Sequence, residues 1–192
     1  MRNLGFMLLC GGHSSRMGQP KALLHIGGET LLARTARAGN AFDERLFSAN
    51  DPIFPTPQGY RRVEDRYADC GPMGGLHACL SACASPALVV APCDTPGYSA
   101  QVAAFLAERF TGDCDALILK DPTGRAHPLL GVYAKSCLPV FEDCLREGRL
   151  ALMRTLSGMN TLVLDAPEAL GRSLFINLNT PEDYEAFLAA NR

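Results

Sequence analysis

The feature that most constrains this chain is the alternation of short apolar runs with helix-like segments. Leu4 to Cys10 and Ala87 to Ala91 are apolar runs of strand length, and each leads through a polar turn into a helical pattern. This order predicts an α/β domain with a mainly parallel sheet. The strand Asp115 to Lys120 is followed by the turn Asp121-Pro122-Thr123-Gly124 and then by Pro128 to Tyr133. The last segment is therefore a return strand, and the sheet is mixed.

The other expected elements complete one domain over residues 1–192, since 192 residues suit one ordinary domain. In the last helix, Thr180 is the N-cap, Pro181 the first helical residue and Asp183 the acid of a capping box. Further helices are expected at Glu29–Asn40, Gly74–Cys83, Ser99–Phe110, Ser136–Arg146 and Ala151–Leu156, and further strands at Arg45–Ala49, Tyr60–Val63, Thr161–Leu164 and Leu174–Ile176.

Composition excludes several classes of protein. Lys and Arg number 18 against 20 Asp and Glu, so the chain lacks the basic excess of a general nucleic-acid binder. No apolar run approaches the roughly 20 residues of a membrane helix, and the first run is not followed by a signal-peptide cleavage pattern. The eight cysteines form no CxxC pair and several lie among apolar residues. We therefore expect reduced thiols in a cytoplasmic protein with no nucleic-acid or membrane partner.

A glycine-rich loop follows the first strand and reads LCGGHSSRMGQPK from Leu9 to Lys21. The paired Gly11 and Gly12 let backbone N–H groups approach an anion, and Arg16 and Lys21 add positive charge. The spacing fits neither a P-loop nor the GxGxxG dinucleotide motif. The loop is a candidate triphosphate site, although the same pattern also suits an ordinary surface turn.

Acidic residues follow two further strands. Asp94 comes directly after the run Ala87 to Ala91, where open α/β sheets bind ligands, so its carboxylate is a candidate ligand of Mg²⁺. Asp65 follows the strand Tyr60 to Val63 and precedes Gly74-Gly75, which can begin a helix close against a ligand. The alternatives are a turn former or helix cap for Asp94 and a solvated turn residue for Asp65.

Six segments of the chain resemble the molybdenum cofactor guanylyltransferases, the MobA-type enzymes of the nucleotidyltransferase superfamily. The Leu9 to Lys21 loop is similar to the family pattern LAGGxxxRMGxxK. The other five follow in the family's order and extend over nearly the whole chain, so that together they argue against chance similarity. They are Glu64-Asp65, Gly71-Pro72-Met73-Gly74-Gly75, Pro92-Cys93-Asp94-Thr95-Pro96, His127-Pro128 and Asn177-Leu178-Asn179-Thr180-Pro181-Glu182-Asp183.

The resemblance implies a Rossmann-like, GT-A-like three-layer sandwich and a GTP:molybdopterin guanylyltransferase. Such an enzyme transfers GMP from GTP to molybdenum-loaded molybdopterin and releases pyrophosphate. The implied metal is Mg²⁺, with Mn²⁺ as an alternative, and the implied protein partners are molybdenum-insertion proteins and recipient molybdoenzymes. A structural turn is the alternative role for His127. The implied residues are Arg16, Lys21 and Asp94 for catalysis, Asp94 for the metal, Leu9, Cys10, Gly11, Gly12, Lys21, Ser48, Asp65 and Asp94 for the nucleotide, and Gly75, His127, Asn177 and Asn179 for molybdopterin.

Three positions depart from the family pattern. Cys10 replaces the usual alanine, and Pro20 replaces a commonly acidic residue. Ser48 stands where some members have asparagine, before a retained Ala49-Asn50. These departures bear on the fine nucleotide contacts more than on the reaction.

Two kinds of alternative function stay open. One is another small-molecule nucleotidyltransferase, in particular a CTP-using molybdopterin cytidylyltransferase, but Gly11-Gly12 and the Pro92 to Pro96 segment favour GTP. The other is an accessory protein that binds GTP without catalysis. Lys21 and Asp94 argue against that function, because binding alone does not require a metal-binding carboxylate.

Overall fold

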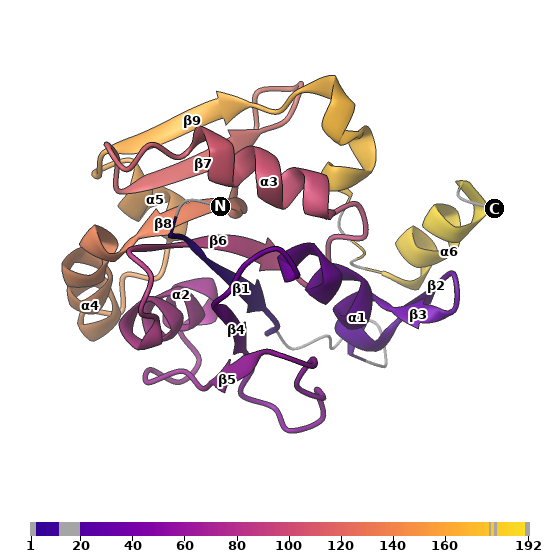
Figure 1. The fold of residues 1–192 in the computed structure, drawn as a ribbon, viewed down its shortest axis with the longest axis horizontal. Helices are drawn as coiled ribbons and strands as arrows, with labels where there is room; N and C mark the ends of the chain where they lie inside the picture. The colour runs from indigo at the N-terminus through magenta and orange to yellow at the C-terminus, as the bar shows by residue number, and fades with distance from the viewer. Residues whose placement is uncertain (1–2, 12–19, 177, 179, 191–192) are drawn as a thin grey trace.

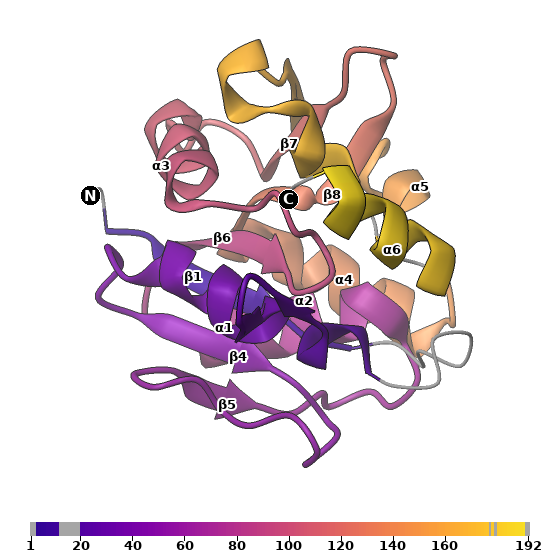
Figure 2. The same cartoon turned by 90° about the vertical axis from the view of Figure 1, so that its right-hand side faces the viewer.

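The computed structural model describes residues 3–11, 20–176, 178 and 180–190, and its main sheet has seven strands (Figure 1). Strand β8 is antiparallel to its neighbours β6 and β7, and all other pairings of this sheet are parallel. The predicted mixed, mainly parallel sheet is therefore confirmed. In spatial order, which Figure 2 shows for the first four, the strands are β5 (Arg61–Val63), β4 (Arg45–Ser48), β1 (Gly5–Leu9), β6 (Ala87–Pro92), β8 (Ala126–Ala134), β7 (Ala116–Lys120) and β9 (Thr161–Asp165).

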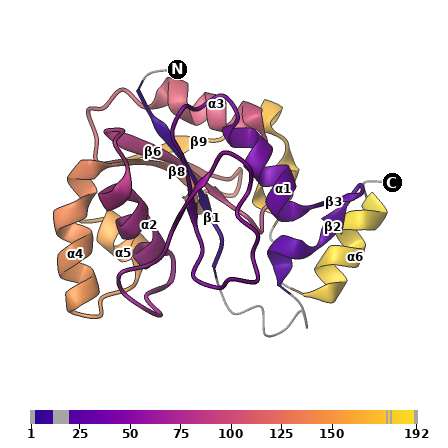
Figure 3. The same cartoon turned by 60° about the horizontal axis from the view of Figure 1, so that its bottom comes forward.

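Helices cover both faces of this sheet, which gives the expected three layers. Helices α2 (Gly71–Ala82), α4 (Leu138–Arg146) and α5 (Leu152–Leu156) lie on one side, and α1 (Leu31–Ala36) and α3 (Ala100–Arg109) lie on the other (Figure 3). Among the described helices, none is long and apolar enough to cross a membrane. The short 3-10 helices are η1 (Lys21–Leu23), η2 (Arg37–Gly39), η3 (Lys135–Cys137), η4 (Glu168–Leu170) and η5 (Arg172–Phe175).

The central strand β1 is buried throughout, as its apolar sequence predicts. Successive side chains of a strand point to opposite faces. Phe6 and Leu8 accordingly belong to the core cluster that includes residues of α1 and α3, whereas Met7 and Leu9 belong to the cluster that includes residues of α2 and α4. A strand that supplies both cores has no solvent face, which explains why its sequence does not alternate.

The predicted helix at Glu29–Asn40 is wrong in its first turn. Glu29–Thr30 form strand β3, which pairs with β2 (His25–Ile26) as a hairpin. The two residues between these strands, Gly27 and Gly28, both have positive φ, at 60° and 87°, which suits a tight hairpin turn. Helix α1 begins after the hairpin, where the Thr30 hydroxyl accepts a hydrogen bond from Ala33 N at 3.1 Å.

The predicted strand at Leu174–Ile176 is also wrong. Leu174 lies inside the 3-10 helix η5, which follows Gly171 at φ 79°. This turn packs directly against the loop after β6, because a Cβ on Gly97 would lie 2.3 Å from the carbonyl carbon of Ser173. Leu174 is buried, so this apolar side chain packs in the core although its backbone forms a turn and not a strand.

The last helix, α6 (Pro181–Ala190), begins as predicted. Thr180 N donates to Asp183 Oδ2 at 2.9 Å, and Asp183 N donates to the Thr180 hydroxyl at 3.2 Å. The helix lies beside the β2–β3 hairpin (Figure 3), where Tyr184 Oη donates to His25 O at 2.6 Å. The hairpin that the sequence did not predict is thus the surface on which the C-terminal helix packs.

Candidate functional site

The candidate site lies where the parallel strands of the main sheet end, an edge that we call the carboxyl edge. Strand β1 has β4 on one side and β6 on the other, so the strand order changes direction between β1 and β6. Ligands bind at such points in open α/β sheets. Beyond the strand ends, Cys10 N donates to Ser48 O at 2.8 Å. Likewise, Cys93 N donates to Leu9 O at 3.0 Å, so the segments after β1, β4 and β6 leave the sheet side by side.

Asp65, after β5, is paired with Asn50, after β4. Asn50 Nδ2 donates to Asp65 Oδ2 at 3.0 Å, and Asp65 N donates to Asn50 Oδ1 at 2.8 Å. Within the described structure, Asp65 Oδ1 is buried without a hydrogen-bond partner. Burial raises the pKa of Asp65, against the opposing effect of the polar side chains of Asn50 and Ser48. The unpaired oxygen can accept a hydrogen bond from a ligand.

Asn50 is a site residue that was not among those expected from the sequence. Ser48, at the end of β4, was expected and lies against Gly75 of α2, but both reciprocal hydrogen bonds with Asp65 come from Asn50. The retained Ala49-Asn50 pair was the available signal in the sequence.

Two glycines bring α2 close to the ends of β1 and β4. A Cβ on Gly75 would lie 2.5 Å from Ser48 Oγ and 2.6 Å from Leu9 Cδ1. A Cβ on Gly74 would lie 3.2 Å from Asp65 Oδ2. The structure therefore brings Gly75, which was expected on the molybdopterin side, against Leu9 and Ser48, which were expected for the nucleotide, and α2 begins at Gly71 rather than at the predicted Gly74. The glycines are needed for this close approach.

Asp94 follows β6 and lies in the field of Lys21, the first residue of η1. Burial raises the pKa of Asp94, and the positive charge of Lys21 lowers it in part. Two thiols lie beside this acid: the hydrogen bond with Cys10, together with burial, raises the pKa of Cys93 well above its ordinary value. Lys21 thus acts electrostatically on Asp94, beside the buried Cys10 and Cys93.

The donor set at Asp94 fits a magnesium ion. A carboxylate that burial disfavours as an anion gains from a bound cation, and Mg²⁺ prefers oxygen ligands. Mg²⁺ is commonly bound by one or two carboxylates together with phosphates and water, so one protein ligand is sufficient. In the ranges that the structure describes, no three His, Cys, Asp or Glu side chains are grouped as a closed metal site requires.

His127 lies at the same edge but farther along the sheet, near the start of β8. Its Nε2 is 2.9 Å from Asp121 Oδ2, and its ring lies 4.8 Å from that of Phe175 between centroids. His127 thus lies on β8, the strand that pairs with β6, and β6 leads to Asp94. Four expected site residues lie outside the described residues: Gly12, Arg16, Asn177 and Asn179.

The loop that carries Asp65 is fixed to α4. Tyr67 Oη donates to Glu142 Oε1 at 2.7 Å, and the buried His77 of α2 has its Nε2 2.6 Å from Glu142 Oε2. Arg146 also donates to Glu142, at 2.8 Å. This carboxylate therefore joins the loop after β5 to two helices and limits the movement of Asp65.

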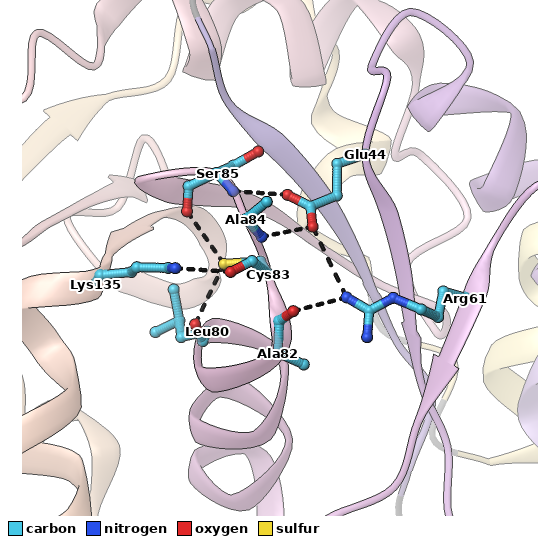
Figure 4. A network of polar contacts seen from close by, with 8 residues as sticks. All are labelled: Glu44, Arg61, Leu80, Ala82, Cys83, Ala84, Ser85 and Lys135. Atoms are coloured by element: carbon cyan, nitrogen blue, oxygen red, sulfur yellow. Dashed lines mark hydrogen bonds and ion pairs between the residues drawn. The ribbon is translucent and has the colours of Figure 1, made fainter.

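A second polar cluster lies at the opposite edge of the sheet, around the last turn of α2; we call it the amino-edge cluster (Figure 4). Glu44 accepts hydrogen bonds from two backbone N–H groups after α2, at 2.7 and 2.8 Å. Arg61 and Lys135 each donate to a carbonyl oxygen at this helix end, both at 2.7 Å. Cations at a helix C-terminus satisfy its unpaired carbonyls and its dipole. The cluster consists of Glu44, Arg61, Leu80, Ala82, Cys83, Ala84, Ser85 and Lys135.

Comparison with known proteins gives matches over nearly the whole chain. The profile of the MobA-like NTP transferase domain matches residues 6–161. A probable molybdenum cofactor guanylyltransferase of Carboxydothermus hydrogenoformans is 34% identical over 195 residues, which cover 98% of this chain and 96% of the relative. The crystal structure of molybdopterin-guanine dinucleotide biosynthesis protein A from Archaeoglobus fulgidus has a TM-score of 0.82 at 23% identity and covers 98% of this chain and 100% of its own. A manganese complex of Rv0371C from Mycobacterium tuberculosis has a TM-score of 0.65 at 18% identity, with 97% and 98% covered.

Proposed function

The chain belongs to the family of MobA-like NTP transferase domains, and on this premise we propose that it transfers GMP from GTP to molybdopterin and releases pyrophosphate. The observation that carries the choice of substrates is the relative named a probable molybdenum cofactor guanylyltransferase, which matches 98% of this chain. The carboxyl edge supports the chemistry, because Asp65 follows β5 and Asp94, in the field of Lys21, follows β6 at the same edge of the sheet.

The nucleotide is placed at the ends of β1, β4 and β5. The glycine-rich segment after Cys10 binds the phosphates through backbone N–H groups, since the N–H of Cys10 itself is bonded to Ser48 O, and Asp65 accepts a hydrogen bond from the base or ribose through Oδ1. Ser48 and Gly75 leave room for this approach, since a larger side chain at residue 75 would fill it. The protein contributes alignment and charge neutralisation rather than a covalent nucleophile.

The reaction needs positive charge on the triphosphate. A terminal phosphate oxygen of molybdopterin attacks the α-phosphorus of GTP, and pyrophosphate leaves with the electron pair of the broken bond. Lys21 and Arg16 stabilise the negative charge that collects on the leaving group. Asp94 would hold Mg²⁺, or alternatively Mn²⁺, and the ion would supply further charge neutralisation.

The acceptor is placed on the β8 side, near His127, Asn177 and Asn179. We assign the reaction to the cytoplasm because all eight cysteines are free thiols, which suits a reducing compartment. Molybdenum-insertion proteins and recipient molybdoenzymes are the partners proposed for delivery of the acceptor and receipt of the product.

The test is a product assay with each of GTP, CTP, ATP and UTP, together with Mg²⁺ and molybdenum-loaded molybdopterin. Pyrophosphate release is measured, and the dinucleotide is identified by mass. We expect product from GTP. Product from CTP instead would retain the nucleotidyl transfer and overturn the choice of base, whereas GTP binding without product would indicate an accessory protein.

A further inference from the structure

The start of β8 is irregular at the point where it carries His127. Leu119 of β7 pairs with His127, but the preceding Ile118 pairs with Gly131, so residues 128–130 are extra in β8. Such bulges redirect side chains and often occur beside active sites. The bulge ends in a close contact, because a Cβ on Gly131 would lie 2.2 Å from a carbonyl oxygen of β7. Tyr133 Oη also donates to Pro128 O at 2.5 Å, which holds the bulge in place.

Both oxygens of Asp121 are occupied in the turn before β8. Oδ1 accepts from Thr123 N at 2.9 Å, from the Thr123 hydroxyl at 2.6 Å and from Arg125 N at 3.1 Å. Oδ2 lies 2.9 Å from His127 Nε2. The contacts with His127 first, and then with Thr123, hold the pKa of Asp121 well below its ordinary range. An ionised carboxylate can only accept hydrogen bonds, so the hydrogen of this contact belongs to His127 Nε2.

The orientation of His127 is therefore set from two sides. Asp121 holds Nε2, and the ring of Phe175 lies against the imidazole at an interplanar angle of 45°. Nδ1 is the ring nitrogen that Asp121 does not contact. Phe175 ends η5 and leads directly into residues 176–179, which contain the two asparagines proposed for the acceptor side.

We propose that Asp121 is a positioning residue for the acceptor: it orients His127 so that Nδ1 contacts the terminal phosphate of the acceptor, a phosphate monoester. The inference rests on the proposed function, because it assigns a subsite of that reaction. His127 binds the phosphate through a hydrogen bond and forms no covalent bond to it. A protonated imidazole donates from Nδ1 to a phosphate oxygen, which makes a strong, charge-assisted hydrogen bond.

Asp121→Asn separates positioning from a purely structural role. The asparagine Oδ1 can keep the contacts with Thr123 and Arg125, whereas its Nδ2 would donate toward His127 Nε2 and force the hydrogen onto Nδ1. Thr123→Ala is the matched control, because it removes one hydrogen bond from the same turn and leaves the His127 contact. His127→Gln is the second probe, since its amide can still donate to Asp121 but it has no equivalent of Nδ1.

The measurements are kcat, the KM for molybdopterin, the KM for GTP and the tautomer of His127 from the imidazole nitrogen shifts by NMR. His127→Gln should raise the KM for molybdopterin about tenfold, as the loss of one hydrogen bond to a charged group predicts. Asp121→Asn leaves a neutral imidazole that still donates from Nδ1, and it should raise this KM about threefold, because a neutral donor makes a hydrogen bond about half as strong as a charged one. In both variants and in Thr123→Ala, the KM for GTP should stay within about twofold of wild type. Asp121→Asn should also move the neutral tautomer from Nε2–H to Nδ1–H.

Two results would overturn the inference while the proposed function stands. One is a wild-type KM for molybdopterin in Asp121→Asn or His127→Gln. The other is an equal rise in the KM for both substrates, or an equal effect of Thr123→Ala, either of which would indicate a structural turn. If the wild type forms no dinucleotide from any nucleotide, the proposed function fails and the acceptor assignment fails with it.

Discussion

Helix α2 extends from one edge of the sheet to the other, and its two ends are built differently. At the amino edge, Glu44 accepts hydrogen bonds from two backbone N–H groups, and Arg61 and Lys135 donate hydrogen bonds to carbonyl oxygens at the end of the helix. At the carboxyl edge, the first turn begins with Gly71 at φ 59°, and no side chain of the described residues caps it. The same helix therefore ends in a closed cluster and begins in a turn that is open by comparison.

The difference separates stability from function. Every charge of the amino-edge cluster has a partner within the chain, as expected for a cluster that fixes the fold. At the carboxyl edge, by contrast, Asp65 keeps a buried oxygen that no described residue pairs, and Asp94 keeps a raised pKa, both at a cost in free energy. Binding sites retain such costs because a ligand removes them. Variants at the two edges should accordingly change different quantities.

The largest effect should come from Asp94→Asn at the carboxyl edge. We expect turnover to fall by about a hundredfold to a thousandfold, as for the loss of one charge-stabilising group in an active site. The thermal unfolding temperature should not fall, because the amide avoids the cost of a buried charge. Steady-state kinetics and calorimetry measure the two quantities, with Asp143→Asn on the exposed side of α4 as the control. Near-normal turnover would remove Asp94 from the mechanism.

Gly75→Ala should lower activity and stability together, because the added Cβ would meet Ser48 Oγ at 2.5 Å and Leu9 Cδ1 at 2.6 Å. We expect kcat/KM for GTP to fall at least about tenfold and the free energy of unfolding to fall by about 1–3 kcal/mol. Gly158→Ala is the control, since its Cβ would have its nearest contact at 3.6 Å. Wild-type kcat/KM for GTP in Gly75→Ala would show that the first turn of α2 does not face the nucleotide.

Lys135→Met tests the amino edge alone. It removes the donor to Cys83 O, which lies 2.7 Å away, so the free energy of unfolding should fall by about 1–2 kcal/mol. Turnover should stay within about twofold of wild type, because the change lies at the far end of α2. Urea unfolding measures the free energy of unfolding. Lys120→Met is the control: it loses an exposed ion pair with Asp165 and should lower the free energy of unfolding by less than about 1 kcal/mol. A loss of turnover without a loss of stability would contradict the separation of the two ends.

The smallest effect should be a pH dependence of stability from Glu44. Burial raises the pKa of this carboxyl, but hydrogen bonds from Ser85 and Ala84 and the charge of Arg61 outweigh burial and lower the pKa below 4.5. A lowered pKa in the folded state means that Glu44 contributes stability above its unfolded pKa and loses it as pH falls through the folded pKa. The stability difference between wild type and Glu44→Gln should therefore be present at about pH 7 and shrink toward about pH 3. A difference that is constant with pH would show that the Glu44 charge does not contribute.

Much of the carboxyl edge could be predicted from the sequence because apolar runs mark the strands and the residues after them are fixed in place. Asp94 follows a fully buried strand, and Cys10 and Gly11 follow another, so parallel pairing alone brings them to one edge. The reciprocal bonds of Asn50 and Asp65 could not be predicted in the same way. These residues lie 15 positions apart, and their contact depends on the pairing of β4 with β5 across a proline-rich loop.

Local pattern failed where tertiary packing decides the conformation. Glu29 and Thr30 precede a helical pattern, but they form a strand because the positive φ of Gly27 and Gly28 turns the chain into a hairpin. The helix propensity of the residues that follow does not decide their conformation. Leu174 is apolar like a strand residue, but it reaches the core from a 3-10 turn against Gly97. The amino-edge cluster also depends on partners from three separate segments, and no sequence spacing marks it.

The antiparallel insertion of β8 between β6 and β7 bears on synthesis of the chain. Strand β6 is buried at every residue, yet its partner on that side, β8, is made only with residues 126–134. Until then, β5, β4, β1 and β6 can pair as a partial sheet whose last strand has an open, wholly apolar edge. Such edges recruit strands from other chains. Fragments that end between residues 93 and 125 should therefore aggregate, and interrupted translation products should depend on chaperones until β8 closes the sheet.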